Sequence, residues 1–449
     1  MQTKYDGVAG GTGKSRRWRY GDWRPAGATG CERTVRRTGI RRVLLLPVWL
    51  VFLGIASAHA TPPYGLDGLI AQTIRNHPGI AARHAEVKAT QAEVEAARSQ
   101  YFPTPSIQLL QDKGESTTVL TLQQPLWAGG RLDAGLDAAQ SRENATRVSV
   151  GDTQYTLALR VTAAWAAWVQ ARGRGEALDK GVALLNVYAE SVGRRIQGGA
   201  SGQVDRELVA ARLAQTQGDL AAARSAERSA LARLAQMVGQ PLRAQDLVVA
   251  DAAAGVDVPL PGLDALVAQA FARSAALRRL EADIETARHE TQQRRAALWP
   301  TLSLRAQHQR DNASATGATA NDSRIMLVLE YSPGAGLSAG ANIDAAEARI
   351  IGLRENLDAA RRDLTETITI DYEEHLAGSD RKRHFQRTLK ASAEVLASYD
   401  RLFVAGKRNW LDVINAAREL IQAQTALADV EAQLVAARAR LRLHIGEML

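Results

Sequence analysis

The sequence lacks the means for cysteine chemistry. Its 449 residues contain one cysteine, Cys31, which lies in an N-terminal leader that we expect to be removed. The exported chain would then have no disulfide, no thiolate nucleophile and no cysteine metal site. No cysteine stands at the predicted cleavage site, so a lipid-anchored form is not expected.

Net charge is also lacking once the leader is set aside. The whole chain carries +8, but residues 1–42 alone hold 11 Lys and Arg against 3 Asp and Glu, and the remainder holds 45 of each. A neutral remainder does not provide the basic surface expected of a nucleic-acid-binding protein. We therefore exclude nucleic acid as a partner.

The sequence also lacks apolar runs long enough for a membrane-spanning helix, which needs about 20 apolar residues. The uncharged run 43–55 is too short for a span. It follows two arginines and precedes a small-x-small cleavage site at 58–60, which is typical of a secretory signal. Residues 1–60 are predicted to be a leader and signal peptide that is removed near Thr61. The length of this leader is consistent with a true start codon downstream of Met1.

What the sequence does contain is an internal duplication. Residues 65–107 align with 262–304 at a constant offset of 197, and later segments align at an offset of 207. The ten extra residues of the second copy fall in the polar stretch 309–323, which we predict to be a loop. A duplication on this scale makes half of the chain the structural unit.

The mature chain is divided accordingly. It is predicted to comprise a first repeat over 61–240, a connector over 241–261 and a second repeat over 262–449.

Helical periodicity dominates each repeat. Residues 131–198 contain no proline, and a helix of that length would run about 100 Å at 1.5 Å per residue. Such a rod needs partner rods beside it. Near the C-terminus, leucines recur every seven residues from Leu420 to Leu441, with Ala423, Val430 and Ala437 between them, which predicts an apolar packing seam.

Short segments between the helices alternate apolar and polar residues. This period of two predicts a β-hairpin over about 105–124 in the first repeat and about 301–331 in the second. The preceding helices are predicted to end at Pro103 and Pro300. Each repeat is therefore predicted to be a helix, a β-hairpin, a very long helix, a turn and a long helix.

The number of strands predicts an oligomer. Strands that cross a membrane have about 9–11 residues, and lipid tolerates them only in a closed barrel. Single-chain barrels begin at eight strands, whereas this chain provides four. Three copies would supply twelve strands, and the same oligomer would place twelve helical rods side by side as a tube below the barrel.

Nearly the whole mature chain resembles the TolC family of outer-membrane channels. The motifs that carry the resemblance are the twin halves, the segment Gln-Pro-Leu-Trp-Ala-Gly-Gly-Arg at 124–131, and Gly406, Arg408, Asp412 and Val413 at the second helical turn. The resemblance implies a mainly α fold with transmembrane β-strands. It implies a homotrimer in outer-membrane lipid, whose twelve-stranded barrel continues into a periplasmic α-helical barrel.

The same resemblance implies that the chain is the exit duct of a tripartite export system. Its partners would be a periplasmic adaptor and an inner-membrane transporter. Residues 331–338 resemble the branch that serves type I protein secretion with an ABC exporter. Multidrug efflux with a proton-driven pump is the alternative, and a periplasmic helical adaptor or scaffold is the alternative of a different class.

The resemblance also implies a gate at the helical turns. Asp412 matches a ring of carboxylates at the periplasmic mouth, Arg408 matches a gate arginine, and Asp205 matches its partner on the neighbouring hairpin. Asn415 stands where the family usually has a second acid, which predicts weaker block by cations. Phe403 replaces a tyrosine of this network, so the gate is expected to depend more on the Asp205–Arg408 pair.

A simpler interpretation of the two acids is open. Each lies six residues after a turn glycine, Gly199 or Gly406, and negative charge is favourable where a helix begins.

Further glycines and prolines mark the predicted exits from barrel to tunnel, where flexible backbone is needed: Pro103, Pro300, Gly129, Gly130, Gly334 and Gly336.

An enzyme is not predicted. Residues 336–340 match the G-x-S-x-G motif of hydrolases, with His375 or His384 as a candidate base. In the first repeat, however, Arg131 occupies the position of Ser338. The eight histidines show no metal-ligand spacing and are expected on helix surfaces, so neither a metal nor a cofactor is expected.

Overall fold

The computed structural model describes residues 64–112, 115–249, 260–313, 319–332 and 334–448. The predicted leader and signal peptide, Cys31 and much of the connector lie outside the described residues. The first half contains α1 (Leu66–Asn76), α2 (Pro78–Ser99), β1 (Thr104–Asp112), β2 (Glu115–Trp127), α3 (Arg131–Gln197), α4 (Gln203–Val238) and η1 (Ala244–Asp246). The second contains α6 (Leu263–Arg273), α7 (Ala275–Ala296), β3 (Thr301–Ala313), β4 (Thr319–Glu330), η2 (Ala335–Leu337), α8 (Ala339–Val404) and α9 (Trp410–His444).

The helix predicted before each hairpin is in fact two helices. In the first half the break falls at His77, whose ψ of 126° is extended because Pro78 follows it. In the second half Ser274 breaks the helix, and its hydroxyl accepts a hydrogen bond of 3.2 Å from the amide of Leu277. The second helix of each pair also ends before Pro103 or Pro300, not at the proline. The prediction of one continuous helix was therefore wrong.

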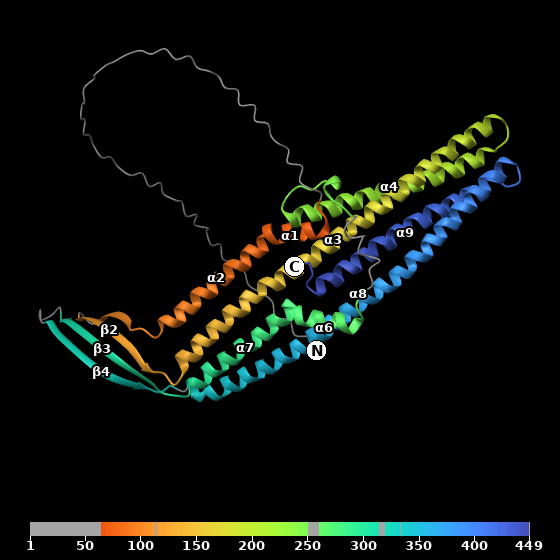
Figure 1. Cartoon of the computed structure of the whole chain (residues 1–449). Coiled ribbons are helices and arrows are strands. Elements are labelled where there is room, and N and C mark those ends of the chain that lie inside the picture. The colour runs from red at the N-terminus through yellow and green to blue at the C-terminus, as the bar shows by residue number, and fades with distance from the viewer. Residues whose placement is uncertain (1–63, 113–114, 250–259, 314–318, 333, 449) are drawn as a thin grey trace, which may run out of the picture. The chain divides into compact units, whose positions relative to one another are not determined.

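The two longest helices form the frame of the molecule. As predicted, α3 is a single helix of 67 residues, about 100 Å long at 1.5 Å per residue. It packs against α2 and α7 near the sheet and against α4 and α9 near the helical turns (Figure 1). The seam predicted along α9 is buried at Ala423, Val430, Leu434, Ala437 and Leu441.

None of the described helices combines the length and the hydropathy needed to cross a bilayer.

The strands form one antiparallel sheet in the order β1-β2-β3-β4, at one end of the helices (Figure 1). The central β2–β3 pairing joins the two halves of the chain. The prediction of a loop over 309–323 was wrong, because β3 runs to Ala313 and β4 begins at Thr319. Backbone ladder bonds do not depend on apolar side chains, and Asp311 of β3 accepts a hydrogen bond of 2.7 Å from Thr117 of β2. The ten extra residues thus lengthen the second hairpin.

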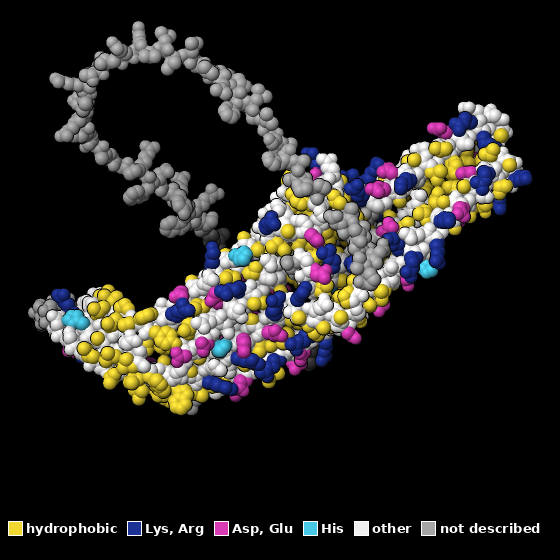
Figure 2. Space-filling view, in the orientation of Figure 1, with side chains coloured by type: hydrophobic (Ala, Val, Ile, Leu, Met, Phe, Trp, Pro, Cys, Tyr) yellow, Lys and Arg dark blue, Asp and Glu magenta, His cyan; other side chains and the backbone are white. Residues whose placement is uncertain are grey.

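The two faces of the sheet differ in polarity. The register places Leu122 beside Ala306, and Ala306 beside Ile325, on one face. Exposed apolar side chains cover this face and gather at this end of the molecule in Figure 2: Ile107, Leu109, Leu120, Leu122, Leu304, Ile325, Leu327 and Leu329. On the opposite face Gln123 bonds to Ser303 and Arg305. Such alternation is typical of a sheet that meets lipid on one side only.

Candidate functional site

Two short connections, one between α3 and α4 and the other between α8 and α9, lie at the end far from the sheet (Figure 1). These two turns have the same backbone conformation. Gly199 and Gly406 adopt positive φ angles of 71° and 70°. Around them, the amide of Ala200 bonds to the carbonyl of Arg195 and the amide of Lys407 to that of Leu402, at 2.8 and 2.9 Å. These are left-handed helix C-caps, in which glycine avoids the steric cost of a Cβ.

The second turn brings two of the predicted gate residues together. Arg408 and Asp412 form an ion pair of 3.3 Å one helical turn apart, with side chains 44% and 31% exposed. Asn409 caps α9, since its Oδ1 accepts a hydrogen bond of 2.9 Å from the amide of Asp412. The guanidinium of Arg408 also lies 4.7 Å from the ring centre of Tyr399. An exposed pair of this kind contributes about 1 kcal/mol or less.

Asp205 is held apart from these residues. It lies in the first turn of α4, which begins after Gly202. Among the described residues of one chain it makes no ion pair with Arg408, which is engaged by Asp412. Asn415 lies one turn beyond Asp412 and is half-buried. One copy of the chain therefore does not bring all the predicted gate residues together.

An aromatic cluster behind the turns was missed by the sequence reasoning. Trp410, the first residue of α9, is buried between Tyr188 of α3 and Phe403 of α8, with ring-centre distances of 5.4 and 5.0 Å. The Tyr188 hydroxyl donates to the carboxylate of Asp400 at 2.9 Å. Burial, and then this hydrogen bond, raise the pKa of Tyr188 well above its usual value. Arg195 of α3 lies 4.0 Å above the Phe403 ring.

A sequence signal for this cluster did exist. At the offset of 207, Trp410 of the second repeat corresponds to Gln203 of the first. A large aromatic residue that breaks the repeat at the start of a helix indicates a packing role specific to one hairpin.

The predicted exits contain glycines in the left-handed region. Gly129, Gly130, Gly334 and Gly336 all have φ angles between 59° and 83°. At Gly129 a side chain would also collide with Trp299. The glycine at this position therefore allows both the turn and a close approach between the start of α3 and the end of α7.

Exposed aromatic residues surround the junction between the sheet and the helices. They are Phe102, Trp127, Trp299 and Tyr331. Aromatic rings gather at this level in membrane proteins because they suit the interface between lipid and water. The sequence reasoning did not single out this group.

The histidines of the second repeat do not support a hydrolase. Ser338 and His375 are separated by about ten turns of α8. The prediction that the histidines lie on surfaces was wrong for His375 and His444, which are both 5% exposed. Helices pack around both residues, and burial followed by the charge of Arg438 lowers the pKa of His375. The described residues contain no group of three potential metal ligands.

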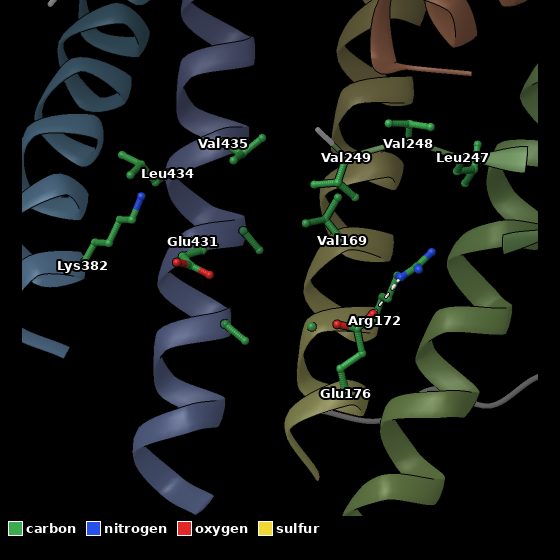
Figure 3. A pocket seen from close by; sticks show the side chains of 13 residues that line it. Val169, Arg172, Glu176, Leu247, Val248, Val249, Lys382, Glu431, Leu434 and Val435 are labelled. Carbon is green, nitrogen blue, oxygen red and sulfur yellow. Dashed lines mark hydrogen bonds and ion pairs between the residues drawn. The ribbon is translucent and has the colours of Figure 1, made fainter. Parts of the chain in front are cut away.

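A cavity of about 560 Å³ lies beside α3 and α9, at the level of residues 247–249 (Figure 3). Its charged lining includes Arg172 and Glu176, which pair with each other at 3.0 Å. None of the predicted gate residues lines it.

A family model described as outer membrane efflux protein matches residues 69–240 and 266–447 of this chain. No curated protein matches it in sequence. Among solved structures, the chain is similar to the channel-forming protein CusC, with a TM-score of 0.71 and 17% identity over 85% of this chain and 92% of that one.

Two further structures are outer-membrane proteins of named bacteria. VceC of Vibrio cholerae has a TM-score of 0.67 and 16% identity over 85% of this chain and 96% of that one. The channel MtrE of Neisseria gonorrhoeae has a TM-score of 0.64 and 16% identity over 85% and 88%. The family model confirms the family resemblance seen in the sequence, and the solved structures share the fold of this chain.

Proposed function

Because the chain belongs to the outer membrane efflux protein family, we propose that it forms the exit duct of a tripartite export system. It is an outer-membrane efflux channel that extends into the periplasm, and its family transports molecules without transforming them. Its proposed partners are two further copies of itself, a periplasmic adaptor and an inner-membrane transporter.

The four-stranded sheet carries this proposal. β1 and β4 each have a neighbour on one side only within the described chain, and the sheet presents an apolar face to its surroundings. Unpaired strand edges are not stable in lipid. Pairing β1 of one copy with β4 of the next closes the sheet, and three copies supply twelve strands. The periplasmic scaffold alternative leaves the exposed apolar face unexplained.

The helical turns form the proposed periplasmic mouth. Three copies of Asp412 around one axis would form a carboxylate ring, which attracts cations. The Arg408 side chain is 44% exposed, and Asp205 makes no ion pair among the described residues of its own chain. We therefore assign the predicted Asp205–Arg408 pair to the contact between copies. Asn415 and Phe403 are the two gate positions at which this chain differs from the usual residues of the family.

The proposed cargo is protein, exported by type I secretion with an ABC exporter. Its support is the sequence of the second exit, 331–338. Efflux of small molecules by a proton-driven pump is the second candidate, favoured by the description of the matching family.

Three measurements test the channel. Cell fractionation should place the protein in the outer membrane, its mass in detergent should be that of a trimer, and planar bilayers containing it should conduct ions. The double variant Asp205→Ala with Arg408→Ser should conduct more than the wild type. A soluble single-chain species would overturn the channel proposal, and unchanged conductance in the double variant would remove only the gate assignment.

The cargo is tested by deletion of the gene. Loss of a secreted protein with unchanged drug sensitivity supports type I secretion. Increased sensitivity to several drugs with normal protein secretion supports the alternative.

A further inference from the structure

The apolar face of the sheet gives way to polar side chains at the end far from the helices. Along β3 this face presents Ala306, then His308 and Arg310, and the last two are exposed. On β4 the register places Ser323 beside His308 and Asn321 beside Arg310. Figure 2 shows basic and histidine side chains at this tip of the sheet, beyond the apolar ones.

The height of Arg310 above the junction with the helices matches the thickness of a membrane core. Tyr331 belongs to the exposed aromatic residues of that junction, and Asn321, the partner of Arg310, lies ten residues before it. Ten residues span about 34 Å of strand, which a tilt of about 40° reduces to about 26 Å across the membrane. The apolar band of a transmembrane barrel is about 25 Å tall. With the helices in the periplasm, Arg310 lies at the level of the outer headgroups.

Arg310 has no acidic partner on this face. Its neighbour Asp311 projects to the opposite face, where it accepts a hydrogen bond from Thr117. Asp322 also belongs to the opposite face, since the register pairs it with Gln309. Among the described residues the guanidinium of Arg310 makes neither an ion pair nor a hydrogen bond.

The neighbours of Arg310 on this face can donate hydrogen bonds. β3 is an inner strand of the sheet, so its neighbours Thr118 and Asn321 belong to the same chain. Their hydroxyl and amide groups are donors. Closer to the helices, Nδ1 of His308 lies 2.8 Å from the Ser323 hydroxyl, which leaves Nε2 for another partner. An arginine fork that is surrounded by donors and has no carboxylate beside it fits a phosphate group.

The side chains nearer the helices fit acyl chains. Leu120 of β2 stands beside His308, and Ile325 of β4 lies two residues from Ser323 on the same face. Leu120 is 50% exposed and Ile325 is 76% exposed. Covering these side chains is favourable for a molecule with hydrocarbon tails, and a free phosphate ion would gain nothing from them.

We propose that Arg310, with His308 and Asn321, binds the phosphate headgroup of an anionic lipid in the outer leaflet, whose acyl chains lie over Leu120 and Ile325. The site rests on the proposed channel function, because it requires the sheet to be in a membrane. It lies on the lipid side of the wall and so makes no contact with the cargo. Each copy of the chain carries one such site.

The test is native mass spectrometry of the full chain in detergent with dioleoyl phosphatidic acid. Dioleoylglycerol has the same acyl chains without the phosphate, and it should bind at least about tenfold more weakly because the charge-assisted hydrogen bonds are absent. Inorganic phosphate at the same concentration should not displace the lipid. The comparison of the two lipids needs no variant.

Variants assign the binding to one face of the sheet. Arg310→Gln should weaken binding of phosphatidic acid about tenfold, and Arg310→Lys, which keeps the charge, should restore most of it. Arg324→Gln is the matched control, since it removes the same charge from a side chain that bonds to Gln307 on the opposite face. It should bind the lipid like the wild type.

The outcomes separate the site from the channel. A wild-type protein that does not enter the outer membrane overturns the channel function, and the site with it. A membrane-inserted wild type that binds dioleoylglycerol as well as phosphatidic acid overturns the headgroup site alone. Displacement of the lipid by inorganic phosphate, or equal losses in Arg310→Gln and Arg324→Gln, would also overturn it.

Discussion

Tyr155 and His444 are joined by a hydrogen bond of 2.6 Å between the phenol oxygen and Nδ1 of the imidazole. The other imidazole nitrogen lies 2.9 Å from Asp371, whose second oxygen accepts a hydrogen bond of 2.7 Å from Arg440. The cluster connects α3, α8 and α9. Asp371 is only 4% exposed, so these hydrogen bonds replace the water that its carboxylate would otherwise bind.

The first prediction concerns the stability of this cluster. Removing the Asp371 carboxylate leaves Nε2 of the buried His444 without its hydrogen-bond partner, and an unsatisfied buried polar group costs about 1–3 kcal/mol. Asp371→Ala should therefore destabilise the folded protein strongly. Glu374 also binds Arg440, but its side chain is 35% exposed, so Glu374→Ala is the control and should cost much less. Denaturant unfolding followed by circular dichroism would measure both, and equal losses would contradict the prediction.

The second prediction concerns alkaline pH. Burial, followed by the charges of Asp371 and Asp152, raises the pKa of Tyr155 from 10.0 to about 12. A pKa that is higher in the folded than in the unfolded chain contributes stability that is complete below about pH 10. That contribution is lost as the pH rises from about 10 to about 12.

The measurement compares the wild type with Tyr155→Phe across this pH range. The stability advantage of the wild type should stay constant below pH 10 and shrink above it. Parallel stability curves for the two proteins up to pH 12 would contradict the assignment.

Sequence patterns predicted the large elements because those elements obey one periodicity. The absence of proline predicted α3, and the alternation of residues predicted both β-hairpins. The predictions failed where local backbone interactions override the periodicity of the side chains. The extended residue before Pro78 and the capping hydroxyl of Ser274 break helices whose periodicity continues across the break. Polar residues after Gln307 hide a strand that the backbone ladder still forms.

The candidate site was predictable only in part, for a physical reason. Turn residues such as Gly406 and Asp412 are required by the local geometry of the turn. They therefore recur at corresponding positions of the two repeats, where the sequence shows them. Tyr188 and Asp400 are far apart in sequence, and only the packing of three helices brings them together. Histidine is usually found at protein surfaces. His444 is buried because it bonds to Tyr155 and Asp371, and no sequence pattern connects these three residues.

The third prediction concerns the exit from the sheet. Alanine at Gly129 or Gly130 would carry the cost of a left-handed backbone, about 1–2 kcal/mol. At Gly129 the new methyl group would also collide with Trp299, whereas nothing lies within 4 Å of the site at Gly130. Gly129→Ala should therefore reduce the yield of folded protein in the membrane more than Gly130→Ala. Native electrophoresis of membrane extracts compares the two, and equal yields would show that the contact with Trp299 is unimportant.

The fourth prediction concerns block by cations. If three Asp412 carboxylates face one axis, multivalent cations should reduce conductance when added to the periplasmic side, because charged rings bind counter-ions. Asp412→Ala should raise the concentration for half-block about tenfold or more, since coordination by three carboxylates is lost. Glu419→Ala changes the charge equally on an exposed part of the same helix and should leave the block unchanged.

Asn415→Asp tests the same ring in the opposite direction. A second acid one turn away would add three further carboxylates to the mouth and should strengthen the block. Because the Arg408–Asp412 pair is exposed, the cations can compete with the arginine for the carboxylate. A block that is indifferent to both Asp412→Ala and Asn415→Asp would place the cation site elsewhere in the channel.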